Sequence, residues 1–230
     1  GRVGRGRGGG GAPGAEAPSP HAAFRHTRVI TPAAWFYIGV LALGLLAFSA
    51  IEGGTFTLLA DDRLGLSQSA VAFVYVLIGL VLAVVQVSLV GPVNTRLKTR
   101  GTVTAALLVN AGGFTLIASA HSVWMLVLGV SCNAVGQGLL RPTCTAAVSN
   151  SVPTEHRGAA IGTQTSAQGL VRIVGPLQAG ALYGGVGPSA PFAVGAGIAV
   201  ATAGLTAAAG RRFDARVMPP AGPEPAPRPA

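Results

Sequence analysis

The stretch AVAFVYVLIGLVLAVVQVSLV, residues 70–90, contains no charged side chain. A transmembrane helix needs about 20 predominantly apolar residues to cross the hydrocarbon core of a bilayer, and this stretch has that length. Open sheet edges cannot face lipid, because their backbone groups would have no hydrogen-bond partner there. The stretch therefore predicts a membrane-spanning helix.

Five further apolar stretches of comparable length flank this one. Of the 230 residues, 50% are hydrophobic and only 10% are charged, whereas a soluble domain has about 25% charged residues. Together these features predict an all-α integral membrane protein with a six-helix transmembrane domain over residues 33–210. The expected helices are 33–51, 69–90, 102–120, 123–148, 159–184 and 190–210.

The two flanks of this domain have a different composition. Residues 1–32 are rich in Gly, Arg and Pro, and residues 211–230 are rich in Pro. Segments of this kind are predicted to be disordered, the first as a basic cytoplasmic tail or as a linker between two halves of a longer protein. Arg-Gly tracts can bind RNA, but interleaved aromatic residues are missing here, so no nucleic-acid partner is expected.

Basic residues near the helix ends predict the orientation in the membrane. If the six segments alternate in direction, nine basic residues fall on one side, and only Arg63, beside Asp61 and Asp62, falls on the other. Lys and Arg are enriched in cytoplasmic loops, so both termini are expected in the cytoplasm and the protein in the plasma membrane. The nine are Arg25, Arg28, Arg96, Lys98, Arg100, Arg157, Arg211, Arg212 and Arg216.

Motifs for metal binding or catalysis are missing from the sequence. Cys132 and Cys144 lie about 18 Å apart along a helix, beyond the reach of a disulfide. Neither C-x-x-C nor H-E-x-x-H occurs, and there is no P-loop, catalytic-triad spacing or dinucleotide fingerprint. We therefore expect no metal, no cofactor and no enzymatic activity.

Two of the predicted helices carry polar residues at a spacing of four. Intramembrane arginine costs at least ~2.5 kcal/mol and usually faces a cavity or a partner. We therefore predict a shared polar cavity, with the alternative that these side chains only tie helices together. Arg141 has a further alternative, which is to extend toward the cytoplasmic end. The stripes are Asn133, Gln137, Arg141 and Thr145 on one helix, and Gln164, Gln168 and Arg172 on the next; the predicted cavity residues are Asn133, Gln137, Gln164, Gln168 and Arg172.

Prolines and one acidic residue complete the set of candidates. Pro142 and Pro176 each remove the hydrogen bond to the carbonyl four residues earlier, so we predict helix bends there, the second together with Gly175. Glu52 is the single acid near a predicted helix. It is either a proton-binding or ion-pair site or an interfacial residue at a helix end.

Two stretches resemble a known family. GPVNTRLKTRG, residues 91–101, is similar to the loop G-x-L-x-D-R-x-G-R-R of the major facilitator superfamily. Gly91, Val93, Arg96 and Arg100 match that pattern, while Thr95 replaces its acid and Lys98 its glycine. Residues 136–184 resemble the tenth and eleventh helices of the tetracycline and multidrug efflux branch, the drug:proton antiporters. The matching patterns are G-x-G-x-x-x-P, R-G-x-x-x-G and R-x-x-G-P-x-x-x-G.

The resemblance implies the C-terminal six-helix half of a 12-helix transporter that works by alternating access. Its expected function is proton-coupled efflux of small amphiphilic compounds. The implied partners are the lipid bilayer, a small-molecule substrate and a coupling proton. A further implied partner is an N-terminal six-helix half missing from this chain, or else a second copy of this chain. The loop residues Gly91, Arg96, Lys98 and Arg100 would gate or anchor the cytoplasmic face.

Two alternatives remain open at this stage. The same fold could take up a nutrient or metabolite instead of exporting compounds. A six-helix membrane scaffold or receptor without transport activity is an alternative of another class, although polar stripes on two consecutive helices argue against it.

Overall fold

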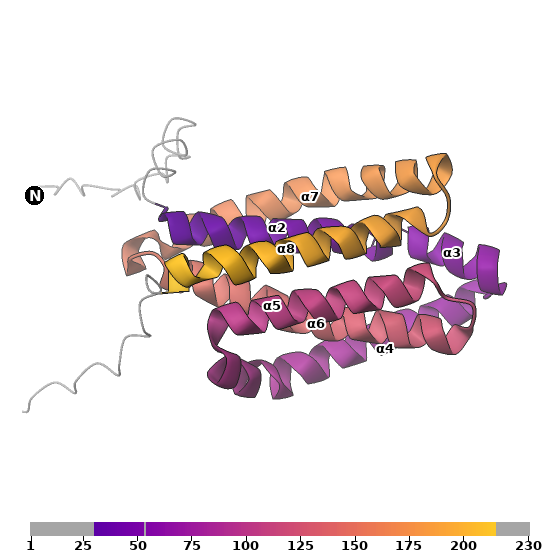
Figure 1. Cartoon of the computed structure of the whole chain (residues 1–230), viewed down its shortest axis with the longest axis horizontal. Coiled ribbons are helices and arrows are strands. Elements are labelled where there is room, and N and C mark those ends of the chain that lie inside the picture. The colour runs from indigo at the N-terminus through magenta and orange to yellow at the C-terminus, as the bar shows by residue number, and fades with distance from the viewer. Residues whose placement is uncertain (1–29, 53, 215–230) are drawn as a thin grey trace, which may run out of the picture.

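The computed structural model describes residues 30–52 and 54–214. These residues form a bundle of long helices that run lengthwise beside one another (Figure 1). The predicted tails lie almost entirely outside the described residues. The helices are α2 (Pro32–Glu52), α3 (Thr55–Leu64), α4 (Gln68–Ser88), α5 (Val90–Ala118), α6 (Val123–Asn150), α7 (Arg157–Gly185) and α8 (Ala190–Asp214), with a 3-10 turn at Thr154–His156.

The prediction of an all-α six-helix bundle is confirmed, because α2, α4, α5, α6, α7 and α8 correspond to the six predicted segments. Local signals fix several helix starts. Ser67 caps α4 by accepting a hydrogen bond from the amide of Ala70, and Ser122 caps α6 by accepting one from Met125, each at 3.3 Å. Gly65 ends α3 in the left-handed conformation, which glycine adopts without strain.

Five of the six long helices are long and apolar enough to cross a membrane, namely α2, α4, α5, α6 and residues 190–209 of α8. The sixth, α7, has the length but is more polar than sequence analysis expected of an apolar segment. Gln164, Gln168 and Arg172 lie on it at four-residue spacing, together with several Ser and Thr residues. It is therefore an amphipathic helix, with one polar face and one apolar face.

The structure also differs from the prediction in two connections. Residues 52–68, expected as a loop, contain α3, whose buried Phe56, Leu59 and Ala60 recur at helical spacing. The loop expected at 91–101 is largely helical and belongs to the first part of α5. The helix is broken there only at Lys98, whose backbone has φ 57° and ψ 169°.

The centre of the bundle is α6, which packs against α5, α4 and α2. Buried residues from these helices form two apolar clusters along the bundle. Leu41, Leu107 and Leu140 belong to one cluster, and Phe56 and Phe114 belong to the other. In contrast, α7 packs mainly against α2 and lies along one edge of the bundle (Figure 1). On the polar face of α7, Arg172 is exposed, Gln168 is half-buried and Gln164 is buried.

Candidate functional site

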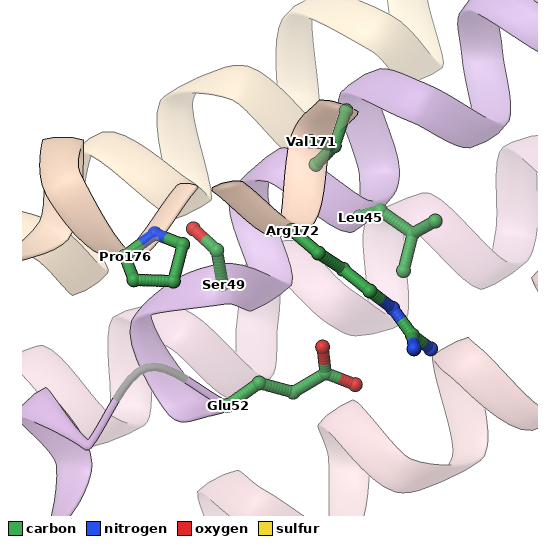
Figure 2. Close-up of a pocket in the computed structure, with 6 residues that line it drawn as sticks. All are labelled: Leu45, Ser49, Glu52, Val171, Arg172 and Pro176. Atoms are coloured by element: carbon green, nitrogen blue, oxygen red, sulfur yellow. The ribbon is translucent and has the colours of Figure 1, made fainter. Parts of the chain in front are cut away.

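A cavity of about 290 Å³ lies between α2 and α7. Figure 2 shows the side chains of Glu52 and Arg172 extending into it from the two helices. The cavity is thus lined by both an acid and a base, and its walls are otherwise small or apolar. Its lining residues are Leu45, Ser49, Glu52, Val171, Arg172 and Pro176.

Gly175 brings the two helices close together beside this cavity. A Cβ atom at Gly175 would lie 2.4 Å from the Cβ atom of Ser49, which is closer than real Cβ atoms approach one another. The Ser49 hydroxyl donates a hydrogen bond of 2.6 Å to the carbonyl of Leu46 and so stays on its own helix. Only glycine permits this approach, and it holds Arg172, three residues earlier, over the face of α2.

Glu52 forms an ion pair with Arg141 of α6. A guanidinium nitrogen of Arg141 lies 3.1 Å from the Oε1 atom of Glu52, and the two side chains are 31% and 40% exposed. Arg141 therefore reaches a partner on α2 rather than extending freely toward the cytoplasmic end. Sequence analysis identified both residues but did not pair them.

Arg172 has no such partner in the part of the chain that the structure describes. No carboxylate lies within 4.0 Å of its guanidinium, and its side chain is exposed. Two guanidiniums and one carboxylate thus meet at or beside the cavity. Their formal charges leave this wall of the bundle with one uncompensated positive charge.

Asn133 and Gln137 are not among the residues that line the cavity between α2 and α7, and their place in a substrate cavity stays a prediction. They are 0% and 1% exposed. The Asn133 side chain donates to the carbonyl of Gly129 at 3.2 Å, and the Gln137 side chain donates to the carbonyl of Gly44 on α2 at 3.3 Å. Gln137 thus links α6 to α2, while the hydrogen bond of Asn133 stays within α6.

The two polar stripes meet at one point. The Gln164 side chain donates a hydrogen bond of 2.8 Å to the hydroxyl of Thr145, which links α7 to α6. Gln164 is 3% exposed, so it is a buried link rather than a cavity wall. Gln168, one turn further along α7, is half-buried and does not line the cavity.

The predicted bend residues lie inside continuous helices. Pro142 is within α6 and Pro176 within α7, and both helices extend for several residues beyond them. Pro176 also lines the cavity, next to Gly175 at the close contact with α2. A bend at these prolines stays a prediction.

The loop residues that match the family pattern gather at the start of α5. Gly91 and Arg96 are exposed, and the guanidinium of Arg100 donates a hydrogen bond to the carbonyl of Ala207 on α8. Lys98 is exposed at the break in the helix. A gating or anchoring role for these four residues stays a prediction.

Sequence analysis missed two kinds of site residue. Ser49 lies three residues before Glu52, on the same face of α2, and this spacing was the available signal. Leu45 and Val171 are apolar and carried no signal. Among the described residues, no group of three or more His, Cys, Asp or Glu side chains is arranged to hold a metal ion.

Comparison with known proteins relates this fold and site to one family. The sequence profile described as the Major Facilitator Superfamily matches residues 29–230. The tetracycline resistance protein of class G from Vibrio anguillarum is 31% identical over 133 residues, which are 58% of this chain and 34% of that protein. The class C protein from Escherichia coli is 25% identical over 165 residues, which are 72% and 41% of the two chains.

A human relative links the sequence comparison to a solved structure. Human major facilitator superfamily domain-containing protein 10 is 30% identical over 162 residues, which are 69% of this chain and 34% of that protein. The crystal structure of this human organic anion transporter aligns with a TM-score of 0.70 and 25% identity, covering 82% of this chain and 46% of the transporter. The chain thus spans less than half the length of these relatives.

Proposed function

This chain belongs to the major facilitator superfamily, and we propose that it is one six-helix half, the C-terminal one, of a proton-coupled efflux transporter for small amphiphilic compounds. Membership of this family makes it a multi-pass membrane protein and a transporter chain rather than an enzyme. The proposed additions are the direction of transport, the coupling ion and the class of substrate.

The observation that carries the proposal is the charged cavity between α2 and α7. Ionisable side chains within a membrane bundle are costly, so they mark substrate or ion pathways more often than packing sites. Here Glu52 and Arg172 extend into one cavity, beside the ion pair with Arg141. Its volume of about 290 Å³ is near the lower end of small-molecule pockets, about 300–1,000 Å³. A cavity of that size is consistent with one part of a larger binding site.

Proton coupling is proposed to run through Glu52. Protonation of a carboxylate removes its attraction to a neighbouring guanidinium. Binding of a proton to Glu52 would therefore release Arg141 on α6, and loss of the proton would restore the pair. The pair joins α6 to the end of α2. Breaking or forming it would therefore change the contact between these two helices beside the cavity.

A second six-helix bundle is proposed to close the cavity. The alignment with the human transporter covers 46% of that chain, so about half of a complete transporter is represented here. The second bundle is an N-terminal half or another copy of this chain. We further propose that both termini lie in the cytoplasm of a plasma-membrane protein, because the basic end of the bundle holds the start of α2 and the end of α8.

The direction of transport is proposed from the relatives. Two of them are named tetracycline resistance proteins. If this protein exports an amphiphilic compound, the concentration of that compound in the cell falls, and the cell becomes more resistant to it. The substrate is proposed to contact Arg172, whose side chain extends into the cavity.

The test is an accumulation assay in a drug-sensitive host. The complete gene is expressed, the protein is verified in the membrane, and cellular accumulation of a panel of dyes and antibiotics is measured with and without a protonophore. We expect lower accumulation of at least one amphiphilic compound, and we expect the protonophore to abolish the difference. Unchanged accumulation across the panel would contradict efflux, and increased accumulation would indicate uptake.

A further inference from the structure

A second cavity, of about 430 Å³, lies between the first part of α5 and the last part of α8. These two parts lie at the same end of the bundle (Figure 1). This second cavity shares no lining residue with the cavity that contains Arg172. Two basic residues line it, together with leucine and alanine residues. Its main lining residues are Leu97, Lys98, Arg100, Thr104, Leu108 and Ala207.

Both basic residues are free of acidic partners among the described residues. No carboxylate oxygen lies within 4.0 Å of Lys98 or Arg100. Arg100 is held in place by donating a hydrogen bond to the carbonyl of Ala207, which ties the start of α5 to α8. The cavity therefore presents two uncompensated positive charges, one of them on a fixed guanidinium.

Lys98 has an unusual backbone conformation. With φ 57° and ψ 169°, it is the sole non-glycine residue with positive φ in the described ranges. This region of conformational space is almost restricted to glycine, and residues that occupy it cluster at functional sites. The family pattern to which residues 91–101 are similar has glycine at this position. This chain instead places a cation at a strained position in the lining of the cavity.

Two leucines that line this cavity are exposed. Leu97 and Leu108 are 48% and 53% exposed, although both belong to a helix that is long and apolar enough to cross a membrane. A soluble anion would leave these leucines uncovered, whereas an acyl chain would cover them. The combination of basic and apolar lining residues is the one that recognises a phospholipid at the bilayer interface.

We propose that this cavity binds an anionic phospholipid, with its phosphate between Lys98 and Arg100 and an acyl chain along Leu97 and Leu108. The cytoplasmic leaflet is the one that carries anionic lipids, and the basic end of the bundle is proposed to face it. The bound lipid would join α5 to α8 at this end. This site is separate from the transport cavity, so the proposal does not depend on efflux.

The test measures lipid-dependent stability of the full chain in nanodiscs. The unfolding midpoint is followed while phosphatidylglycerol replaces phosphatidylcholine with the same acyl chains. We expect a saturable rise of the midpoint in the wild type. Removal of one cation by Lys98→Gln should weaken the apparent affinity for phosphatidylglycerol about fivefold, the effect expected of one basic residue at a membrane surface.

Arg96→Gln is the matched control, because it removes the same charge from an exposed position that does not line the cavity. It should weaken the affinity for phosphatidylglycerol by less than Lys98→Gln does, because its charge acts only through diffuse attraction to the membrane surface. Lys98→Gly is the second variant, since glycine adopts this backbone without strain. Lys98→Gly should fold even if Lys98→Gln does not, and it should raise the unfolding midpoint in pure phosphatidylcholine. Its affinity for phosphatidylglycerol should fall by as much as that of Lys98→Gln.

Three results would overturn the proposal. Equal stabilisation by the two lipids would show that the headgroup charge is not recognised. An equal effect of Lys98→Gln and Arg96→Gln would show diffuse attraction to the membrane surface instead of a site. Stabilisation by inorganic phosphate in phosphatidylcholine nanodiscs, as large as that by phosphatidylglycerol, would show a site for a soluble anion.

Discussion

A guanidinium nitrogen of Arg141 lies 3.1 Å from a carboxylate oxygen of Glu52 and so joins α6 to the end of α2 beside the cavity. This pair occupies the only acidic side chain at the cavity among the described residues, and Arg172 is left without a counter-charge. A counter-charge for Arg172 would come from the proposed substrate or from the proposed second bundle. Because Arg141 is paired with Glu52, Arg172 is the basic residue at the cavity that is available to bind an anionic group.

Glu52→Gln is expected to abolish proton-driven transport while the protein still folds. Glutamine keeps the shape of the side chain but can neither bind a proton nor pair with Arg141 as an anion. Because the pair is partly exposed, its loss should cost at most about 1 kcal/mol of stability. The measurement is substrate uptake into inverted membrane vesicles under an imposed pH gradient, compared with exchange of labelled substrate without a gradient.

Asp61→Asn is the matched control for this variant, because it removes an exposed carboxylate on α3 that has no ion-pair partner within 4.0 Å. It should transport normally. Gradient-driven uptake by Glu52→Gln at the wild-type rate would remove Glu52 from the coupling step.

Arg172→Ala is expected to lose transport with membrane insertion preserved. The side chain extends into the cavity and makes no ion pair within the described residues, so its removal leaves no buried partner unsatisfied. Arg172→Lys should keep part of the activity, since it retains the charge but not the planar fork. Accumulation of a transported dye, normalised to protein in the membrane, measures both variants. Thr165→Ala, at an exposed position on the same helix, is the control and should transport normally.

Much of the fold was predictable because lipid imposes a simple rule of length and polarity. Long apolar segments with few charges identified the six long helices. The short helix α3 escaped this rule because its ten residues cannot span a bilayer. The early start of α5 was missed because Gly91 and Pro92 indicate a loop, although proline is tolerated in the first turn of a helix.

The candidate site was predictable only in part, and helix geometry explains why. At 3.6 residues per turn, a spacing of four residues rotates each side chain by about 40° relative to the previous one. The stripe on α6 therefore winds around the helix. Asn133 lies against Gly113 of α5, Gln137 bonds to α2, and Thr145 bonds to α7. A spacing of four residues showed which side chains lie near one another along α6, but it could not show which neighbouring helix each of them would meet.

Gly113→Ala is expected to destabilise the contact between α5 and α6, whereas Gly112→Ala is not. A Cβ atom at Gly113 would lie 2.4 Å from Nδ2 of Asn133 and 2.7 Å from the backbone carbonyl of Gly129, which cannot turn away. Such overpacking typically costs about 1–3 kcal/mol. The neighbouring Gly112 has no atom within 4 Å of the same position. Unfolding midpoints of the two variants in detergent should differ, and equal midpoints would contradict the close approach.

Gly175→Ala is expected to lower both stability and transport, because Gly175 sets the distance between α2 and α7. The added Cβ would meet the Cβ atom of Ser49 at 2.4 Å, and neither atom can rotate out of the contact. The two helices must then separate, and Arg172 would move away from the face of α2 on which Glu52 lies. We expect a destabilisation of about 1–3 kcal/mol and a transport loss greater than stability alone explains.

Gly169→Ala provides the comparison on the same helix. Its Cβ would have no atom within 4 Å, and alanine favours a helix over glycine by up to about 1 kcal/mol. This variant should therefore be as stable as the wild type or more stable, with normal transport. The paired measurement is the unfolding midpoint together with dye accumulation per inserted molecule. If both variants transport alike, the separation of α2 and α7 does not control the cavity.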